Sequence, residues 1–378
     1  MKPKLRFKEF SDEWCETTLG ETTTFKQGIQ VDVDKQFSKP FDNSVRFIRI
    51  VDYTQNTKDI RYISKPANAN YVDEHDVVLV RYGATAGFVG HGIKGVIANN
   101  MFTVTPNSNI NKDFLYTILK QDKIYKKLNS SNGSSAMPAL NFGSVSILKF
   151  SYPSIDEQNK LTNLINLLDK KIELQSKKIE DLKLFKSYTK IRLFQNGDKT
   201  IKLGDILTKW NKKNKDGLID YVESISNKFG FISQSDQFED RNVASKDLKN
   251  YYVIEKNVFG YNPSRLNVGS LALKDNDNIS VVSPLYECFT TNQNNKFMLE
   301  WFDSIYFKRG TLSRFEGGVR NTLNFTNLCE IEINLPSIEL QNKYATYLST
   351  LDKKIKFEEQ KLNELKNLKK GLMQNMFV

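Results

Sequence analysis

Four loops of the chain combine glycine with basic, amide, hydroxyl and aromatic side chains, and they cover residues 81–87, 134–138, 261–269 and 314–321. Glycine lets the backbone approach a ligand closely, arginine and asparagine offer paired hydrogen bonds to base edges, and serine or lysine holds phosphate. The loops are therefore suited to nucleic-acid contact, although for any single loop an ordinary turn with solvated charges is the favoured interpretation. The residues expected to make these contacts are Arg81, Tyr82, Gly83, Thr85, Ser134, Ser135, Tyr261, Asn262, Arg265, Asn267, Arg314, Arg320 and Asn321.

Patterns for catalysis are missing from the sequence. There is no GxxxxGK[ST] phosphate loop, and the glycines between 83 and 90 are spaced unlike a dinucleotide-binding fingerprint. Residues 262–265, Asn-Pro-Ser-Arg, lack the second proline and the aromatic residue of the Asn-Pro-Pro-aromatic motif of adenine methyltransferases. Asp352, Glu364 and Lys366 imitate a nuclease acid–acid–lysine pattern, but they lie in an expected helix, where such residues are typical of the surface.

The cysteines and histidines do not indicate a metal site. Cys15, Cys288 and Cys329 are far apart and include no CxxC pair, which argues against both zinc and a disulfide framework. The two histidines, His75 and His91, are too few for a multi-histidine metal site, and neither belongs to a nucleophile–base motif. We therefore expect no catalytic residue, no metal and no cofactor in this chain.

The composition is that of a globular protein with a polyanionic partner. The chain has 378 residues, 39% hydrophobic and 26% charged, with a net charge of +11. A basic surface gains affinity for phosphates by releasing their counterions, although solubility or an AT-rich genome that favours lysine codons would also explain the charge. No apolar run reaches the roughly 18–20 residues that span a bilayer, and the basic N-terminus lacks an apolar signal core. We expect a cytoplasmic protein.

An internal repeat organises the chain. Residues 153–160, Pro-Ser-Ile-Asp-Glu-Gln-Asn-Lys, recur at 336–343 as Pro-Ser-Ile-Glu-Leu-Gln-Asn-Lys, an offset of 183. Leu-Asp-Lys-Lys-Ile at 168–172 recurs at 351–355 in the same ungapped register. Because a missed repeat leads to a wrong fold assignment, we treat this duplication as the main organising feature.

Both repeated segments are expected to form long helices. Each opens with Pro-Ser followed by acidic residues, a typical helix start, and each then carries apolar residues at a spacing of three and four. This is a coiled-coil seam of about 40 residues, or roughly 60 Å, with polar breaks at equivalent positions. Pairing of the two helices is the simplest interpretation, and packing of each on its own domain is the alternative. The expected packing residues are Leu168, Ile172, Ile179, Leu182, Leu351, Ile355, Leu362 and Leu365.

Two globular domains precede the helices. We expect domains at 1–151 and 197–334 and helices at 152–196 and 335–378. β-Branched runs at 45–50, 77–82, 251–254 and 330–335 predict strands, so the fold class is mixed α/β (α+β). The domains align with each other only at their edges, where Leu-Gly-Glu at 19–21 matches Leu-Gly-Asp at 203–205. Matching edges with different interiors suggest one scaffold that carries two recognition surfaces.

These motifs together resemble the specificity subunit of type I restriction–modification systems. The resemblance covers essentially the whole chain and includes the Leu-Gly openings, the strand followed by RYGxxxG at 81–87, YNPSRLNVGS at 261–270 and the paired LDKKI helices. The family pattern usually has Glu-Gln at the helix start. Glu157-Gln158 keeps it, whereas Leu340-Gln341 departs from it, a change expected to matter little.

The resemblance implies a non-catalytic, DNA-binding subunit. Each globular domain would be a target recognition domain for one half of a bipartite, asymmetric sequence, and the helices would form an antiparallel spacer. Two methyltransferase subunits, which use S-adenosylmethionine, would dock on the chain and flip out the adenine that they methylate. Two motor–nuclease subunits, which use ATP and Mg²⁺, would complete the complex.

Two other functions are compatible with the residues alone. A coiled-coil scaffold could join proteins without touching DNA, and a stand-alone DNA-modifying enzyme could carry an unrecognised active site. If the chain is the DNA-binding subunit, the rigid helix pair acts as a ruler, because two domains on a rod reach two half-sites only at a fixed distance.

Overall fold

The computed structural model describes residues 2–55, 57–130, 139–227, 229–234, 247–268, 270–312, 314 and 322–378. Four expected contact residues, Ser134, Ser135, Arg320 and Asn321, lie outside the described residues, as does the side chain of Asn267. Among the helices of the described part, none is long and apolar enough to cross a membrane.

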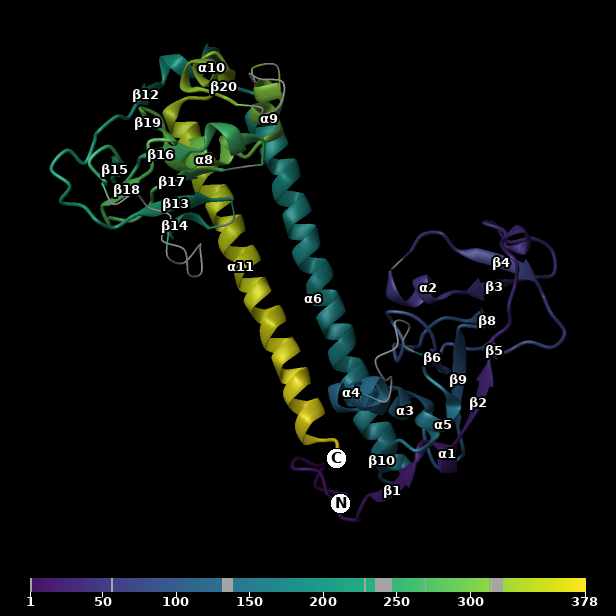
Figure 1. Cartoon of the computed structure of the whole chain (residues 1–378). Helices are drawn as coiled ribbons and strands as arrows, with labels where there is room; N and C mark the ends of the chain where they lie inside the picture. The colour runs from purple at the N-terminus through teal and green to yellow at the C-terminus, as the bar shows by residue number, and fades with distance from the viewer. Residues whose placement is uncertain are drawn as a thin grey trace. The chain divides into compact units, whose positions relative to one another are not determined.

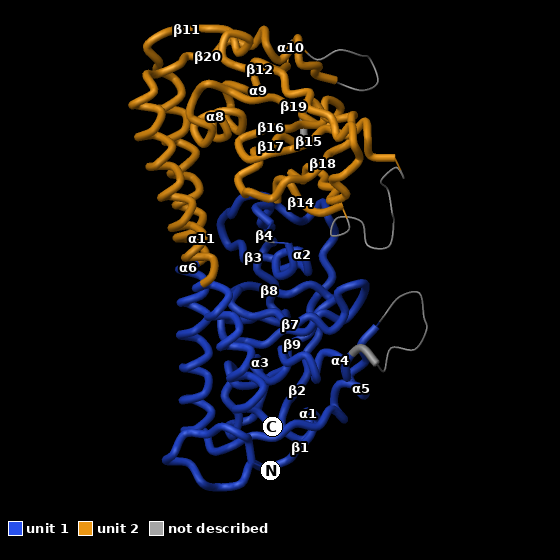
Figure 2. The backbone as a smooth tube through the Cα atoms, turned by 90° about the vertical axis from the view of Figure 1, so that its left-hand side faces the viewer, with its two compact units in different colours: residues 1–175, 361–378 blue, residues 176–360 orange. Residues whose placement is uncertain are grey.

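The chain divides into two compact units (Figure 2). Unit 1 comprises residues 1–175 and 361–378, and unit 2 comprises residues 176–360. Each unit therefore contains one globular part and half of each long helix, whereas the boundaries expected from the sequence follow the ends of the helices.

The globular part of unit 1 contains two four-stranded sheets and a two-stranded pair. The first sheet has the order β2-β9-β6-β7, the second has the order β4-β3-β8-β5, and β1 pairs with β10. The strands are β1 (Cys15–Thr18), β2 (Thr23–Gln27), β3 (Ser44–Ile48), β4 (Arg61–Ser64), β5 (Tyr71–Val72), β6 (Val77–Val80), β7 (Val89–Gly90), β8 (Gly95–Ile97), β9 (Met101–Pro106) and β10 (Lys149–Tyr152). The helices are α1 (Leu19–Thr22), η1 (Val33–Lys35), α2 (Ile50–Thr54), α3 (Lys112–Leu119), α4 (Asp122–Ser130) and α5 (Phe142–Ser146).

The globular part of unit 2 repeats the first sheet with the order β12-β19-β16-β17. Three two-stranded pairs accompany it, β11 with β20, β13 with β14 and β15 with β18. The strands are β11 (Lys199–Lys202), β12 (Leu207–Lys209), β13 (Glu223–Ser226), β14 (Gly230–Ser233), β15 (Tyr252–Ile254), β16 (Phe259–Tyr261), β17 (Leu271–Leu273), β18 (Ser280–Val282), β19 (Glu287–Thr291) and β20 (Glu332–Leu335). The helices are η2 (Leu203–Asp205), η3 (Pro263–Val268), α8 (Asn295–Phe302), α9 (Ile305–Leu312) and α10 (Phe325–Cys329).

The mixed α/β fold class is confirmed, and the four expected strands are β3, β6, β15 and β20, each shorter than expected. Of the strand predicted at 330–335, the last four residues form β20. Its first residue, Glu330, is the C-cap of α10. Ile50 likewise begins α2 rather than ending β3.

The repeat extends much further into the globular parts than the sequence analysis allowed. Helices α3, α4 and α5 have counterparts in α8, α9 and α10, and β10 has its counterpart in β20, all displaced by the same 183 residues. In the sequence, the residues that match at this offset form only short apolar and aromatic stretches. They are hard to recognise because the strands around them differ between the two units. Our expectation that the domains align only at their edges was therefore wrong for the second half of each domain.

The shared Leu-Gly openings have a packing reason. A Cβ atom on Gly20 would lie 2.8 Å from Cβ of Ser146 in α5, and one on Gly204 would lie 3.1 Å from Cβ of Cys329 in α10. Ser146 and Cys329 are themselves related by the offset of 183. In both units glycine lets the opening turn approach the short helix closely.

The long helices are α6 (Ile155–Gln195) and α11 (Ile338–Asn375), and they pack antiparallel (Figure 1). In unit 2, Lys178 pairs with Glu358 and Lys186 with Asp352, so numbers rise along one helix as they fall along the other. Among the expected packing residues, the side chains of Leu168, Ile179, Leu351, Ile355 and Leu365 are buried, and those of Ile172, Leu182 and Leu362 are half-buried.

One glutamine near the start of each long helix joins the helix to its globular part. The Gln158 side chain is 0% exposed; Oε1 accepts from the backbone N–H of Asn111 at 2.9 Å, and Nε2 donates to the carbonyls of Asn109 and Pro153. Gln341, also 0% exposed, accepts from the N–H of Asn294 at 3.1 Å and donates to the carbonyl of Pro336. Asn111 and Asn294 cap α3 and α8, so each glutamine fixes a cap and a helix start together.

The helix starts differ at the preceding residue. Glu157 is 1% exposed and receives two hydrogen bonds from Arg6, at 2.8 and 2.7 Å, which form a bidentate ion pair with the N-terminal segment. The equivalent residue in the second copy is Leu340, which is half-buried. The second copy therefore lacks the carboxylate that forms this ion pair in the first copy, whereas the hydrogen bonds of the glutamine are kept.

Candidate functional site

The loop at 81–87 connects β6 to β7 at one end of the first sheet of unit 1. The segment that follows the undescribed residues 131–138 returns beside it. Tyr82 and Ala139 form an antiparallel bridge, and the N–H of Leu140 donates to the carbonyl of Arg81 at 2.9 Å. The described segment that begins at Ala139 therefore lies against the loop at 81–87.

Arg81 links the loop at 81–87 to the segment that begins at Ala139, and we call this contact the junction. Its Nε donates to the carbonyl of Leu140 at 3.1 Å, and an Nη donates to Oε1 of Gln27 at 2.7 Å. The guanidinium also lies 4.9 Å from the ring centroid of Tyr82 and 5.2 Å from that of Phe142. Stacking on aromatic faces and a fixed donor fork pre-organise the side chain, which is half-buried.

Amide side chains surround Arg81, and the sequence analysis missed them. Gln27 Nε2 donates to the carbonyl of Asn99 at 2.7 Å, and Asn99 Nδ2 donates to Oε1 of Gln30 at 3.2 Å. Gln27 ends β2, Gln30 lies in the segment after β2, and Asn99 lies in the turn before β9, so no single motif contains these residues. Arginine, asparagine and glutamine side chains are the groups that most often hydrogen-bond base edges.

The rest of this loop is open to solvent. The Tyr82 side chain is 43% exposed. Gly83 has a φ of +89°, and a Cβ at this position would meet nothing within 4 Å. Thr85 is half-buried. The loop therefore presents an aromatic face and an accessible backbone.

The loop after β16 in unit 2 occupies the equivalent topological position, since β6 and β16 are the third strands of sheets with the same order. Asn262 Oδ1 accepts from the N–H of Ser264 at 3.0 Å and stabilises the start of η3. Arg265 is exposed and makes no ion pair with any residue in the described ranges. The N–H of Leu323 donates to the carbonyl of Pro263 at 3.1 Å, as Leu140 does to Arg81 in unit 1.

Two of the expected contact residues have structural surroundings instead. Tyr261 is 0% exposed and packs against Phe289 at 6.2 Å between ring centroids, so its side chain lies in the core and not on the surface. Burial raises the pKa of Tyr261 far above its usual range, and its hydroxyl has no partner among the described atoms. Arg314 donates to the carbonyls of Gly310 and Glu330 and thereby ties α9 to α10.

A short repeat marks the junction in both units. Leu-Asn-Phe occurs at 140–142 and again at 323–325, at the offset of 183. The leucines are 1% and 0% exposed, the asparagines cap α5 and α10, and the phenylalanines are the first residues of these two helices. Extending the known offset into the globular parts would have found this signal.

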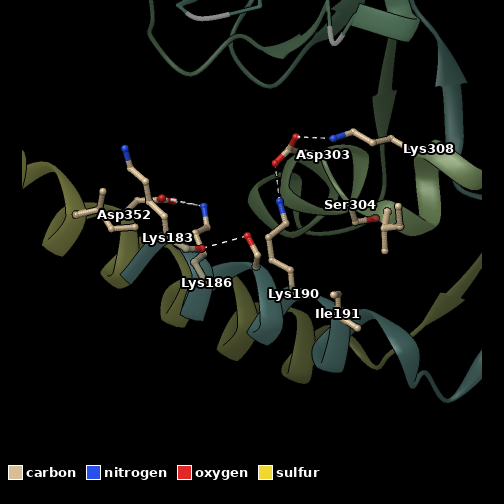
Figure 3. Close-up of a pocket in the computed structure, with 11 residues that line it drawn as sticks. Lys183, Lys186, Lys190, Ile191, Asp303, Ser304, Lys308 and Asp352 are labelled. Carbon is tan, nitrogen blue, oxygen red and sulfur yellow. Dashed lines mark hydrogen bonds and ion pairs between the residues drawn. The ribbon is translucent and has the colours of Figure 1, made fainter. Parts of the chain in front are cut away.

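Each unit also has a groove between its long helices and a pair of short helices, which are α3 and α4 in unit 1 and α8 and α9 in unit 2. In unit 2 the groove is about 440 Å³ and is lined by Lys183, Lys186, Lys190, Asp303 and Asp352, among others (Figure 3). In unit 1 the groove is about 600 Å³, and Lys366 and Lys369 occupy the positions of Lys183 and Lys186. The grooves are therefore copies in position, although the unit 1 groove contains more lysine.

Asp352 has a structural role in this groove. Both of its carboxylate oxygens accept from Lys186, at 2.8 and 2.7 Å. Burial opposes the charge of Lys186, but the carboxylates of Asp352 and Glu300 outweigh it and raise the pKa of Lys186. The ion pair supports our interpretation of Asp352 as a helix-surface residue.

Comparisons with known proteins identify the family. Residues 11–184 and 197–367 match the family described as type I restriction modification DNA specificity domain, one match for each half of the duplicate. A curated relative, the type I restriction enzyme MjaVIII specificity subunit of Methanocaldococcus jannaschii, is 22% identical over 96% of this chain and 91% of its own length.

Solved structures share the fold. The type I restriction–modification S subunit from M. genitalium superposes with a TM-score of 0.62 at 16% identity, and the match covers 100% of this chain and 99% of that one. A chain from a structure of complex assembly and conformational transition of the type I system matches with a TM-score of 0.58 at 13% identity, over 95% and 96% of the two chains.

The chain belongs to the type I restriction–modification DNA specificity family. It is a specificity subunit, the non-catalytic component of a type I restriction enzyme, as the resemblance in its motifs implied.

Proposed function

We propose that each globular part is a target recognition domain that reads one half of a bipartite, asymmetric DNA sequence. The observation that carries the proposal is the equivalence of the loops at 81–87 and 262–270. They follow equivalent strands and adjoin equivalent Leu-Asn-Phe segments, yet they hold different side chains. A common frame with different loops supports two different half-sites.

The proposed contact set follows from the surroundings of each residue. In unit 1 it contains Arg81, Tyr82, Gly83 and Thr85, with the added amides Gln27, Gln30 and Asn99. In unit 2 it contains Asn262 and Arg265, and Asn267 stays in the set on the sequence argument alone because its side chain lies outside the described residues. Ser134, Ser135, Arg320 and Asn321 stay in the set on the sequence argument alone, whereas buried Tyr261 and the structurally engaged Arg314 act as supports.

We further propose that two methyltransferase subunits dock on the long helices, one on each unit. Exposed apolar side chains at equivalent positions support two equivalent docking places. Leu174 and Leu368 of unit 1 are 59% and 51% exposed, and their counterparts in unit 2, Phe357 and Phe185, are 62% and 50% exposed. Apolar groups left in solvent on a helix pair are typical of an interface.

The remaining chemistry would belong to the partners. S-adenosylmethionine would bind to the methyltransferase subunits, and ATP and Mg²⁺ would bind to two motor–nuclease subunits. Adenine methylation at the recognised site, and cleavage of unmodified DNA, would follow from these partners. The complex would act in the cytoplasm, where the chromosome is accessible.

Genome-wide mapping of methylated adenines tests the reading function. Cells with the chain should show one two-part methylated motif that disappears when the chain is deleted. Exchange of residues 81–87 for those of another family member should alter one half of the motif and leave the other half unchanged. If no motif depends on the chain, or if both halves change together, the division of reading between the units is wrong.

Measurement of complex mass tests the docking proposal. Replacing Leu174 and Leu368 by serine should remove one methyltransferase per complex, and replacing Phe185 and Phe357 should remove the other. The matched control is Leu167→Ser, which is 67% exposed and has no apolar counterpart at 350, where the residue is threonine. Full occupancy in both double variants would contradict docking at these positions.

The ruler function of the helices has its own test. Inserting seven residues into α6 and seven at the matching level of α11 lengthens the pair by about 10 Å, or roughly three base pairs of duplex. The unread gap in the methylated motif should lengthen, or methylation should stop. An unchanged gap would exclude the helix pair as the ruler.

A further inference from the structure

The only two histidines in the sequence meet in unit 1, although the sequence analysis expected them to be too few for a metal site. Nδ1 of His75 lies 3.1 Å from Oδ1 of Asp113, and Nε2 of His91 lies 3.1 Å from the same oxygen. The three potential ligand atoms lie within 4.8 Å of one another. Two imidazoles and one carboxylate thus converge on one point.

Three separate segments hold these side chains. His75 lies in the turn before β6, where its N–H donates to Oδ1 of Asp73 at 2.8 Å. His91 follows β7, and its ring stacks on Tyr116 with centroids 4.4 Å apart. Asp113 lies in the first turn of α3, where its N–H donates to the capping Asn111 at 2.7 Å. Because each segment is fixed by its own contacts, the cluster is pre-organised.

The neighbouring charges leave Asp113 free for the imidazoles. Lys112 pairs with Asp76 at 2.6 Å and with Asp73 at 3.4 Å, so this cation is directed to two aspartates of the turn before β6. The cluster is also accessible, because the side chains of His75, His91 and Asp113 are 69%, 21% and 23% exposed. An ion could therefore enter from solvent.

We propose that His75, His91 and Asp113 bind one Zn²⁺ ion, with water in the fourth position. Zinc binds imidazole nitrogen and carboxylate oxygen at about 2.0–2.2 Å in a tetrahedron, which separates neighbouring ligand atoms by about 3.3 Å. The two distances of 3.1 Å match this spacing. The ion would clip the turn before β6 and the segment after β7 to α3, and so stabilise the frame of unit 1.

The test uses the full chain without a histidine tag, since the chain has only two histidines of its own. After treatment with a chelator, titration with ZnCl₂ should show one equivalent bound per chain and should shift the ring resonances of both histidines. Zinc at about 100 times the Kd should raise the melting temperature of one transition by about 5–10 °C.

Three variants make the test specific. His75→Ala, at the exposed ligand, and Asp113→Asn, which keeps the size of the side chain, should each weaken binding at least tenfold and abolish the thermal shift. Glu74→Gln, an exposed neighbour outside the cluster, should bind zinc like the wild type. Absence of a one-equivalent phase, or binding unchanged in His75→Ala and Asp113→Asn, would overturn the proposal and leave a hydrogen-bonded cluster that responds to pH alone.

Discussion

Lys186 reaches across the helix pair of unit 2 to both carboxylate oxygens of Asp352, and this contact has a copy in unit 1. There Lys369 reaches both oxygens of Asp169, at 2.5 and 2.6 Å. Both residues are displaced by 183 positions and have exchanged helices. Polar residues within an apolar seam align the two helices at one register, because any slip separates the charges.

The two copies of this ion pair should contribute differently to the free energy of unfolding. Lys186 also pairs with Glu300 at 2.8 Å and is 17% exposed, whereas Asp169 is the one acidic partner of Lys369 in the part of the chain that the structure describes. We expect Lys186→Met to cost about 1–2 kcal/mol of unfolding free energy and Lys369→Met at most about 1 kcal/mol. Urea denaturation measures both. Lys183→Met, which breaks an exposed pair with Glu359, is the control with an expected change below about 0.5 kcal/mol.

Breaking the buried ion pair between Lys274 and Glu223 in unit 2 should cost more unfolding free energy. Lys274 is 0% exposed and lies 2.5 Å from Oε2 of Glu223, which also accepts from the Ser280 hydroxyl. Glu223→Ala leaves a buried ammonium without its partner and should cost about 3–5 kcal/mol. The double variant Glu223→Leu with Lys274→Met should recover most of this loss, and a double variant as unstable as the single one would contradict our account.

Two glycines should respond oppositely to alanine. Gly20→Ala forces a Cβ to within 2.8 Å of Ser146 and should destabilise unit 1 by about 1–3 kcal/mol. Gly371 lies inside α11 with nothing within 4 Å of an added Cβ, so Gly371→Ala should stabilise by up to about 1 kcal/mol. Thermal melts of the two variants give the comparison, and a harmless Gly20→Ala would refute the packing explanation of the Leu-Gly opening.

Exposed loop residues should control DNA affinity. Arg265→Ala or Tyr82→Ala should weaken binding to the cognate site by about 1–3 kcal/mol while the complex with partner subunits still assembles. Fluorescence anisotropy with cognate and random duplexes separates the cases, because equal losses on both would argue against base reading. Tyr261→Phe is the control: its hydroxyl is buried without a described partner, so DNA affinity should not change.

The long helices and their seam could be predicted because their signal is local. Residues such as Leu168 and Leu351 recur at helical spacing in an ungapped register, and the structure buries them as expected. The order of strands could not be predicted, since pairs such as β3 with β8 join residues about 50 positions apart and run parallel. Nothing in a short strand of three to five residues specifies such a partner.

The candidate site was predictable in part. The loops at 81–87 and 261–269 were found from their residue types, but composition alone cannot tell a side chain that points outward from one that points inward. Tyr261 was expected to be a contact residue and is buried, whereas Gln27 and Asn99, which are linked to Arg81 by hydrogen bonds, carry no local signal in the sequence. His75 and His91 likewise meet Asp113 only through the arrangement of three segments.

The joint made by Gln158 bonds only main-chain groups: the N–H of Asn111 and the carbonyls of Asn109 and Pro153. Such an attachment does not depend on which side chains those positions carry. Substitutions at these positions of the globular part would therefore leave the hydrogen bonds of Gln158 intact. This part of the attachment between the globular part and the long helix tolerates sequence change on the globular side.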